Sequence, residues 1–173
     1  MKTKITSLND ALAFLLQGLY FTETKLKNEF PSFCSEITSR KIRSEIENYT
    51  GSADDKMLKL EKVFNYLMVE PLSRRNDVIN GLMNEMHQII SSTASTHLRD
   101  ILAIDCLQNV NAYKIAGYRS AYMFAVEMEL DTATELLQQI LEWEIDSSKS
   151  FSELEIEEFN KAQQPAVILD STW

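Results

Sequence analysis

The 173-residue sequence is poor in the residues that allow sharp turns, with only 4 glycines and 3 prolines. A soluble chain of this length ordinarily contains about 20 of the two together. β-Hairpins, β-sandwiches and phosphate-binding loops depend on such residues. The glycines are also too widely spaced for a dinucleotide-binding or P-loop motif, at Gly18, Gly51, Gly81 and Gly117. This scarcity predicts an all-α domain.

Cysteine, positive charge and long apolar runs are scarce as well. Cys34 and Cys106 match no metal-binding spacing, so we expect buried thiols in a reducing compartment. The net charge of −9 and the absence of a basic cluster disfavour nucleic acid and anionic membrane surfaces as partners. No stretch approaches the roughly 20 apolar residues of a membrane span. Asp10 and Gln17 interrupt a weak signal-peptide-like start, and we expect a cytoplasmic protein.

Apolar residues recur at helical spacing in five segments. Four are long and one is short, and they lie near residues 8–30, 40–70, 76–90 (the short one), 97–129 and 132–159. Ser7 and Thr132 are the expected N-caps of the first and last segments, and Pro31 either ends or kinks the first. Four long amphipathic helices with short connections predict an antiparallel four-helix bundle. The short helix falls in the crossover between the second and third long ones, which permits a ferritin-like topology.

The pattern predicts one bundle domain over residues 1–160 and a C-terminal tail over 161–173. A chain of this length can bury a sizeable core. The tail contains Pro165 and the apolar run Ala166–Leu169. It is too short for its own core, so it packs on the bundle, packs on a partner subunit or stays loose.

Several short strings follow one another in an order that points to a family. The most specific is Val110–x–x–Tyr113–x–Ile115–Ala116–Gly117–Tyr118. The others are Leu16–Gln17–Gly18–Leu19–Tyr20 with Thr22–Glu23–x–x–Leu26, Leu60–Glu61–Lys62–Val63–Phe64, Gly81–Leu82–Met83, Arg99–Asp100, and Ala133–x–x–Leu136–Leu137 with Leu141–Glu142–x–Glu144. Over residues 7–150 the chain thereby resembles the bacterial ferritin-like stress-protein family of the YciE/YciF type.

The resemblance implies a bundle similar to di-iron carboxylate proteins, in which Glu and Glu-x-x-His side chains from four helices hold two metal ions. It places the corresponding positions at Glu23 in the first helix, Gly51 and Asp54 in the second, Asn111 and Lys114 in the third long helix, and Glu144 in the last, with Glu142 as a register alternative.

Only three of these positions are acidic, namely Glu23, Asp54 and Glu144. A buried Lys114 beside two divalent ions would be repelled strongly in a medium of low dielectric constant. It can instead pair with the inward carboxylates. We therefore expect a lost di-metal centre, replaced by a buried Lys–carboxylate cluster, and no cofactor. Gly51 either leaves space for a neighbouring side chain or marks a helix break around residues 50–52.

The resulting expectation is a non-catalytic protein with a structural or protein-interaction role. As the resemblance implies, it would act in a stress response and form a homodimer, while any other protein partner is unidentified. His87 and His97 are expected in surface or structural roles, and no catalytic residue is expected. The aromatic residues near the former metal positions are expected to be plain core, and these are Tyr20, Tyr113 and Tyr118.

The alternative is an enzyme with a carboxylate-bridged centre that acts as an oxidase, ferroxidase or peroxidase. Its iron or manganese, in a di-metal or mononuclear site, would be held by Glu23, Asp54 and Glu144, with Glu142 as a further ligand. A mononuclear site of this kind requires Lys114 to turn out to solvent.

Overall fold

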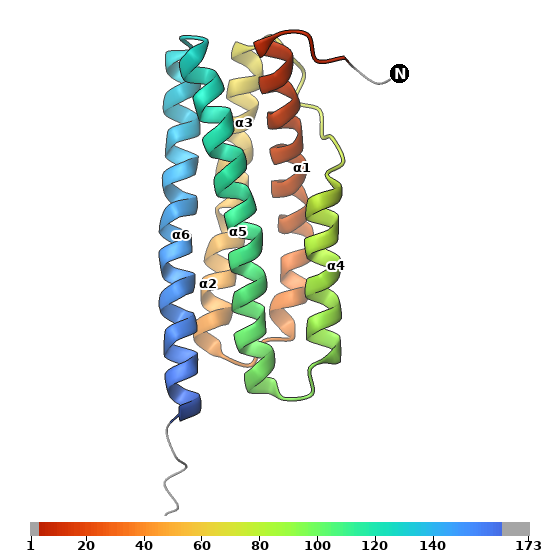
Figure 1. The fold of residues 1–173 in the computed structure, drawn as a ribbon, viewed down its shortest axis with the longest axis vertical. Coiled ribbons are helices and arrows are strands. Elements are labelled where there is room, and N and C mark those ends of the chain that lie inside the picture. Colours follow the sequence, from red (N-terminus) through yellow and green to blue (C-terminus); the bar gives the residue numbers. More distant parts are fainter. Residues whose placement is uncertain (1–3, 164–173) are drawn as a thin grey trace, which may run out of the picture.

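The computed structural model describes residues 4–163, which form six α-helices and no strand. The helices are α1 (Leu8–Ser35), α2 (Arg40–Gly51), α3 (Ala53–Tyr66), α4 (Asp77–Ser92), α5 (Thr96–Glu127) and α6 (Asp131–Gln163). The first, the α2–α3 pair, α5 and α6 make an antiparallel four-helix bundle, and the short α4 lies in the crossover beside α5 (Figure 1). The predicted fold class is confirmed.

The first long helix begins where the sequence predicts and passes its proline. The Ser7 hydroxyl accepts a hydrogen bond from the Asp10 backbone N–H at 3.1 Å. The Asp10 carboxylate in turn accepts from the backbone N–H and the hydroxyl of Thr6. Pro31 lies inside α1 and does not end it, since the helix continues to Ser35.

The second long helix is interrupted for a single residue, Ser52, which separates α2 from α3. The hydroxyl of Thr50 donates to the carbonyl of Ile46 at 2.7 Å, and that of Ser52 to the carbonyl of Tyr49 at 2.7 Å. Hydroxyls bonded back to helix carbonyls commonly bend helices. Gly51 is exposed, and a Cβ added to it would meet no atom within 4 Å. The helix-break alternative is therefore confirmed and the gap-filling alternative is wrong.

The last helix differs from expectation at both ends. It begins at Asp131, so Thr132 lies inside the helix and is not its N-cap. It continues to Gln163, three residues beyond the predicted end of the domain. Of the predicted tail, residues 164–173 lie outside the described part of the chain.

The bundle core consists of two apolar clusters stacked along its axis. One gathers around the C-terminal half of α1, α2, α4 and the N-terminal half of α5, and the other around the N-terminal half of α1, α3 and the C-terminal half of α5. Helix α5 packs beside α1 and α6, and α3 packs beside the same two. The order around the bundle is therefore α1, α5, α6, α3. Between residues 4 and 163, no helix has the length and apolarity needed to cross a bilayer.

Candidate functional site

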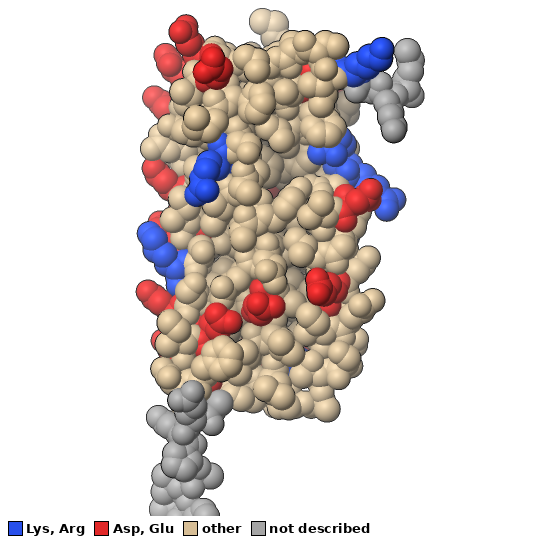
Figure 2. Space-filling model, viewed as in Figure 1, with Lys and Arg blue, Asp and Glu red and all other residues tan. Residues whose placement is uncertain are grey.

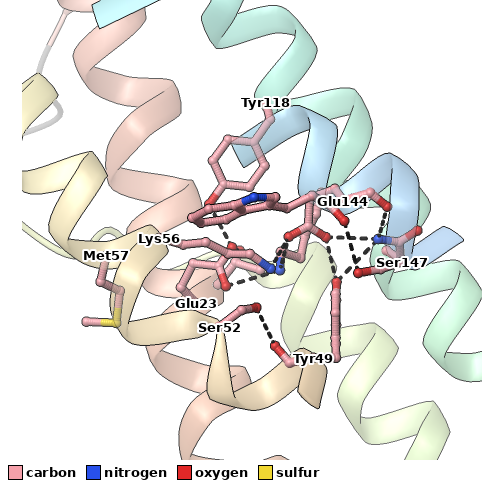
Figure 3. Close-up of polar contacts among 12 residues, drawn as sticks. Glu23, Tyr49, Ser52, Lys56, Met57, Tyr118, Glu144 and Ser147 are labelled. Carbon is pink, nitrogen blue, oxygen red and sulfur yellow. Dashed lines mark hydrogen bonds and ion pairs between the residues drawn. The ribbon is translucent and has the colours of Figure 1, made fainter. Parts of the chain in front are cut away.

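Four charged side chains meet where the two apolar clusters join, one from each long helix (Figure 3). They are Glu23 of α1, Lys56 of α3, Lys114 of α5 and Glu144 of α6, and each is at most 1% exposed. Lysine and glutamate are almost never fully buried unless they are paired. The helical repeat explains the placement, because each of the four continues the inward stripe of its own helix.

The two lysines are paired with the two carboxylates. Lys114 Nζ lies 2.9 Å from Glu23 Oε1, 3.1 Å from Glu23 Oε2 and 2.8 Å from Glu144 Oε1. Lys56 Nζ lies 2.5 Å from Glu144 Oε1. Positive and negative side chains therefore alternate around the bundle, and the four formal charges cancel.

Three uncharged side chains complete the cluster. Tyr118 donates its hydroxyl to Glu23 Oε1 at 2.6 Å, and Tyr49 donates to Glu144 Oε2 at 2.7 Å. Asn111 donates from Nδ2 to Glu144 Oε2 at 2.9 Å and to the backbone carbonyl of the same residue at 3.0 Å. Hydrogen bonds to an ionised acceptor are about twice as strong as neutral ones. Each of the two carboxylates therefore accepts at least one hydrogen bond from an uncharged side chain.

Lys56 is less completely satisfied than Lys114. Its Nζ forms an ion pair with Glu144 Oε1 that lacks hydrogen-bond geometry. Among residues 4–163 this Nζ has no hydrogen-bond partner. It lies 4.7 Å from the centre of the Tyr49 ring, on which Lys114 Nζ also lies at 4.5 Å. The amide oxygen of Asn111 is likewise buried with no partner in the described chain. The cluster therefore contains an unpaired acceptor and an under-paired cation.

The charges shift the pKa values of the group in different directions. Burial alone would raise the pKa of Glu144, but the ammonium groups of Lys114 and Lys56 outweigh it and lower this pKa to about 2. For Lys114, burial opposes the charged form, yet Glu144 and Glu23 together raise its pKa well above the ordinary value. For Lys56, burial and the neighbouring Lys114 charge prevail and lower the pKa. The difference arises because Lys114 touches two carboxylates and Lys56 touches one.

The tyrosines are held in their neutral form. Burial raises the pKa of Tyr49 well above its ordinary value, and the Glu144 carboxylate adds to the effect. Burial followed by the Glu23 carboxylate does the same for Tyr118. Both hydroxyls therefore keep their protons and act as hydrogen-bond donors.

The structure brings together four of the residues that the resemblance singled out, namely Glu23, Asn111, Lys114 and Glu144. It places the other three elsewhere. Asp54 is exposed and pairs with Lys27 at 2.5 Å, and Gly51 is at the surface. Glu142 is also exposed and accepts a hydrogen bond from Gln138.

The register predicted for the second long helix is therefore wrong by two residues. The side chains that face the core are Ala53 and Lys56, which hold the same i, i+3 spacing as Gly51 and Asp54. Successive residues turn about 100° around a helix, so a two-residue shift moves a position to the far side. The signal was present in the sequence, because Lys56 lies seven residues after Tyr49 and seven before Val63 on the apolar stripe.

Tyr118 is a buried core residue, as predicted, and its hydroxyl also belongs to the polar cluster through the hydrogen bond to Glu23. Tyr20 and Tyr113 are partly buried and bond to Glu61 and Asn76 respectively.

The remaining polar candidates lie outside the cluster. His87 is exposed and lies 3.7 Å from Glu29, while His97 is partly buried and lies 3.8 Å from Glu158. Both cysteines are buried free thiols, as predicted. Within the described residues, no three His, Cys, Asp or Glu side chains are grouped so that they could hold a metal ion.

The fold and this cluster define an all-α bundle protein with a buried, charge-balanced ion cluster. A family model described as a domain of unknown function (DUF892) matches residues 7–164. The chain belongs to this family.

Two proteins match this chain closely, one of them both in sequence and in its solved structure. The chain is 23% identical over 156 residues to protein YciF of Escherichia coli K12, covering 90% of this chain and 94% of that protein. The solved structure described as the E. coli stress protein YciF matches with a TM-score of 0.86 and 22% identity over 91% of this chain and 99% of that one. YcfI from Rhodopseudomonas palustris, described as a candidate structural protein, matches with a TM-score of 0.84 and 21% identity over 88% and 97% of the two chains.

Proposed function

We propose that this chain is a non-catalytic bundle protein of the YciF type, in which a lysine–carboxylate cluster stands in place of a di-metal centre. The observation that carries the proposal is the position of Lys114 Nζ, which lies within 3.1 Å of both inward glutamates. An ammonium at that point takes the carboxylate oxygens that a divalent cation needs as ligands. Two lysines among two carboxylates do not suit a di-metal centre.

The proposed role rests on the chemistry of this core. A buried, paired cluster supplies rigidity and a defined helix register rather than a reactive group. We propose a structural or protein-interaction role, cytoplasmic, in a stress response, with two copies of the chain as the working unit. The description of the E. coli relative as a stress protein supports the choice of response. On the face shown in Figure 2, Lys and Arg do not gather into a patch, which agrees with a partner other than nucleic acid.

The metal content of the purified protein tests the proposal directly. We expect less than a tenth of an equivalent of iron or manganese per chain after expression in medium supplemented with both metals. A Lys114→Glu/Asn111→Glu variant, prepared in the same way, shows whether these two substitutions alone removed a site. Two equivalents of metal in the wild-type protein would contradict the proposal and favour the oxidase or ferroxidase alternative.

A further inference from the structure

The arrangement of charge around the bundle contains a second cation that the family resemblance did not lead us to expect. The carboxylates come from α1 and α6, which are diagonally opposite, and the lysines come from α3 and α5, which are the other diagonal. Both Nζ atoms contact the same oxygen of the Glu144 carboxylate, Oε1. The core thus holds two cations, both supplied by the chain.

The surroundings of Lys114 Nζ have the form of a cation site. Three carboxylate oxygens from two residues lie within 3.1 Å of it, two from Glu23 and one from Glu144. Hard divalent cations prefer such an all-oxygen set, at distances of about 2.0–2.6 Å. The amide oxygen of Asn111 is a further buried acceptor without a partner in the described chain.

Lys56 supplies the second positive charge that the two carboxylates require. With Lys114 alone the cluster would carry one uncompensated buried negative charge, which is strongly unfavourable. Its single ion pair, to Glu144 Oε1, neutralises that charge. The second lysine also adds a repulsive charge against any cation that approaches the site.

Resting on the proposed function, we infer that Lys56 and Lys114 are built-in counter-ions, and that the core becomes a binding site for one divalent cation when both are removed. Without the two ammonium groups, Glu23 and Glu144 retain two negative charges, which one divalent ion balances. Their oxygens already converge on the point that Lys114 Nζ vacates.

The test compares wild-type protein with a Lys56→Ala/Lys114→Ala variant, using Mn²⁺ alone as the probe. We expect one equivalent of Mn²⁺ to bind the variant, measured by electron paramagnetic resonance of free Mn²⁺, and a rise in its Tm on addition of the ion. The wild type should show neither. A Lys27→Ala/Lys62→Ala variant, which removes the same charge from exposed positions, is the matched control and should behave as wild type.

A Lys56→Met/Lys114→Met variant, which keeps the aliphatic volume, covers the case in which the alanine variant does not fold. In the wild type, the low pKa of Glu144 means that the unfolded state binds more protons between pH 4.5 and about 2, so stability falls as pH falls. In the methionine variant the buried carboxyl groups lack their cations, so burial favours their protonated form in the folded state. Its stability should therefore rise as pH falls toward about 4.5, whereas Glu144 lowers the stability of the wild type below that pH.

The outcomes separate the two proposals. Stoichiometric Mn²⁺ in the wild type overturns the proposed function. A folded alanine variant that binds no Mn²⁺, or a methionine variant with the acid profile of the wild type, overturns only this inference. If neither variant folds, ¹⁵N NMR of lysine Nζ in the wild type decides, because two slowly exchanging ammonium signals are expected and their absence overturns the inference.

Discussion

Lys56 and Asp100 are buried charged residues whose contacts join neighbouring segments of the bundle. Lys56 takes an inward position where the heptad repeat normally has an apolar residue, and its charge balances Glu144. Asp100, at the start of α5, is 3% exposed. Its carboxylate accepts hydrogen bonds from the backbone N–H of Thr38 at 2.9 Å, the Thr38 hydroxyl at 2.6 Å and the Ser39 backbone N–H at 2.7 Å.

Removing the Asp100 carboxylate leaves backbone donors at the beginning of α2 without partners. Hydrogen bonds to charged groups contribute about 1.5–3 kcal/mol, and a lost cap alone costs about 1 kcal/mol. We expect Asp100→Ala to lower the free energy of unfolding by about 3 kcal/mol, measured by urea denaturation. Asp105→Ala, an exposed aspartate on the same helix, is the control and should change it by less than about 0.5 kcal/mol. Equal losses in the two variants would contradict the assignment.

At the scale of the helix, the scarcity of glycine means that residues other than glycine take the left-handed position after two helices. Helices α3 and α5 are each followed, two residues after their last helical residue, by a residue with left-handed backbone, Met68 with φ 53° and Glu129 with φ 55°. The backbone N–H of Val69 bonds to the carbonyl of Phe64 at 3.1 Å, which is the long hydrogen bond of a Schellman motif. Glycine is the usual residue at this point because a Cβ is disfavoured there.

Met68→Gly should therefore stabilise the protein. Met68 is 95% exposed, so its side chain has little packing to lose. We expect the free energy of unfolding to rise by about 0.5–1 kcal/mol in thermal or urea denaturation. Leu58→Gly, at an exposed position in the middle of α3, should have the opposite effect, because glycine costs about 1 kcal/mol inside a helix. A loss of stability in Met68→Gly would show that the left-handed position carries no strain.

At the scale of the whole molecule, the bundle leaves large apolar side chains on its outer surface. On α5 and α6 these include Leu98, Met123, Val126, Trp143 and Phe159, each at least 38% exposed. These exposed apolar side chains are available for contact with a second copy of the chain, and two-fold dimers are the commonest closed assembly.

The proposed dimer can be tested by measuring the mass of the protein in solution. Light scattering coupled to size-exclusion chromatography should give a mass twice the 19.9 kDa of one chain. The mass should fall toward that of a single chain on dilution, while circular dichroism shows that the helices persist. A single-chain mass at every concentration would contradict the dimer.

How much of the site the sequence could reveal varied from helix to helix. In α1, α5 and α6 the inward stripe is regular and the family strings fix its phase, so Glu23, Asn111, Lys114 and Glu144 were found. In the second long helix the family string covers residues 60–64, one turn beyond the site, and the predicted phase is two residues early. That error replaced Ala53 and Lys56 with Gly51 and Asp54, which face solvent.

By itself, the sequence determined that the chain is helical and that four long helices form one bundle. These follow from composition and from periodicity, which depend on neighbours along the chain. Only the tertiary structure decided that a second lysine, two tyrosine hydroxyls and an asparagine amide surround the same two carboxylates. The physical reason is that these groups meet across helices far apart in sequence, and a rotation of about 100° per residue decides which side chain reaches the centre.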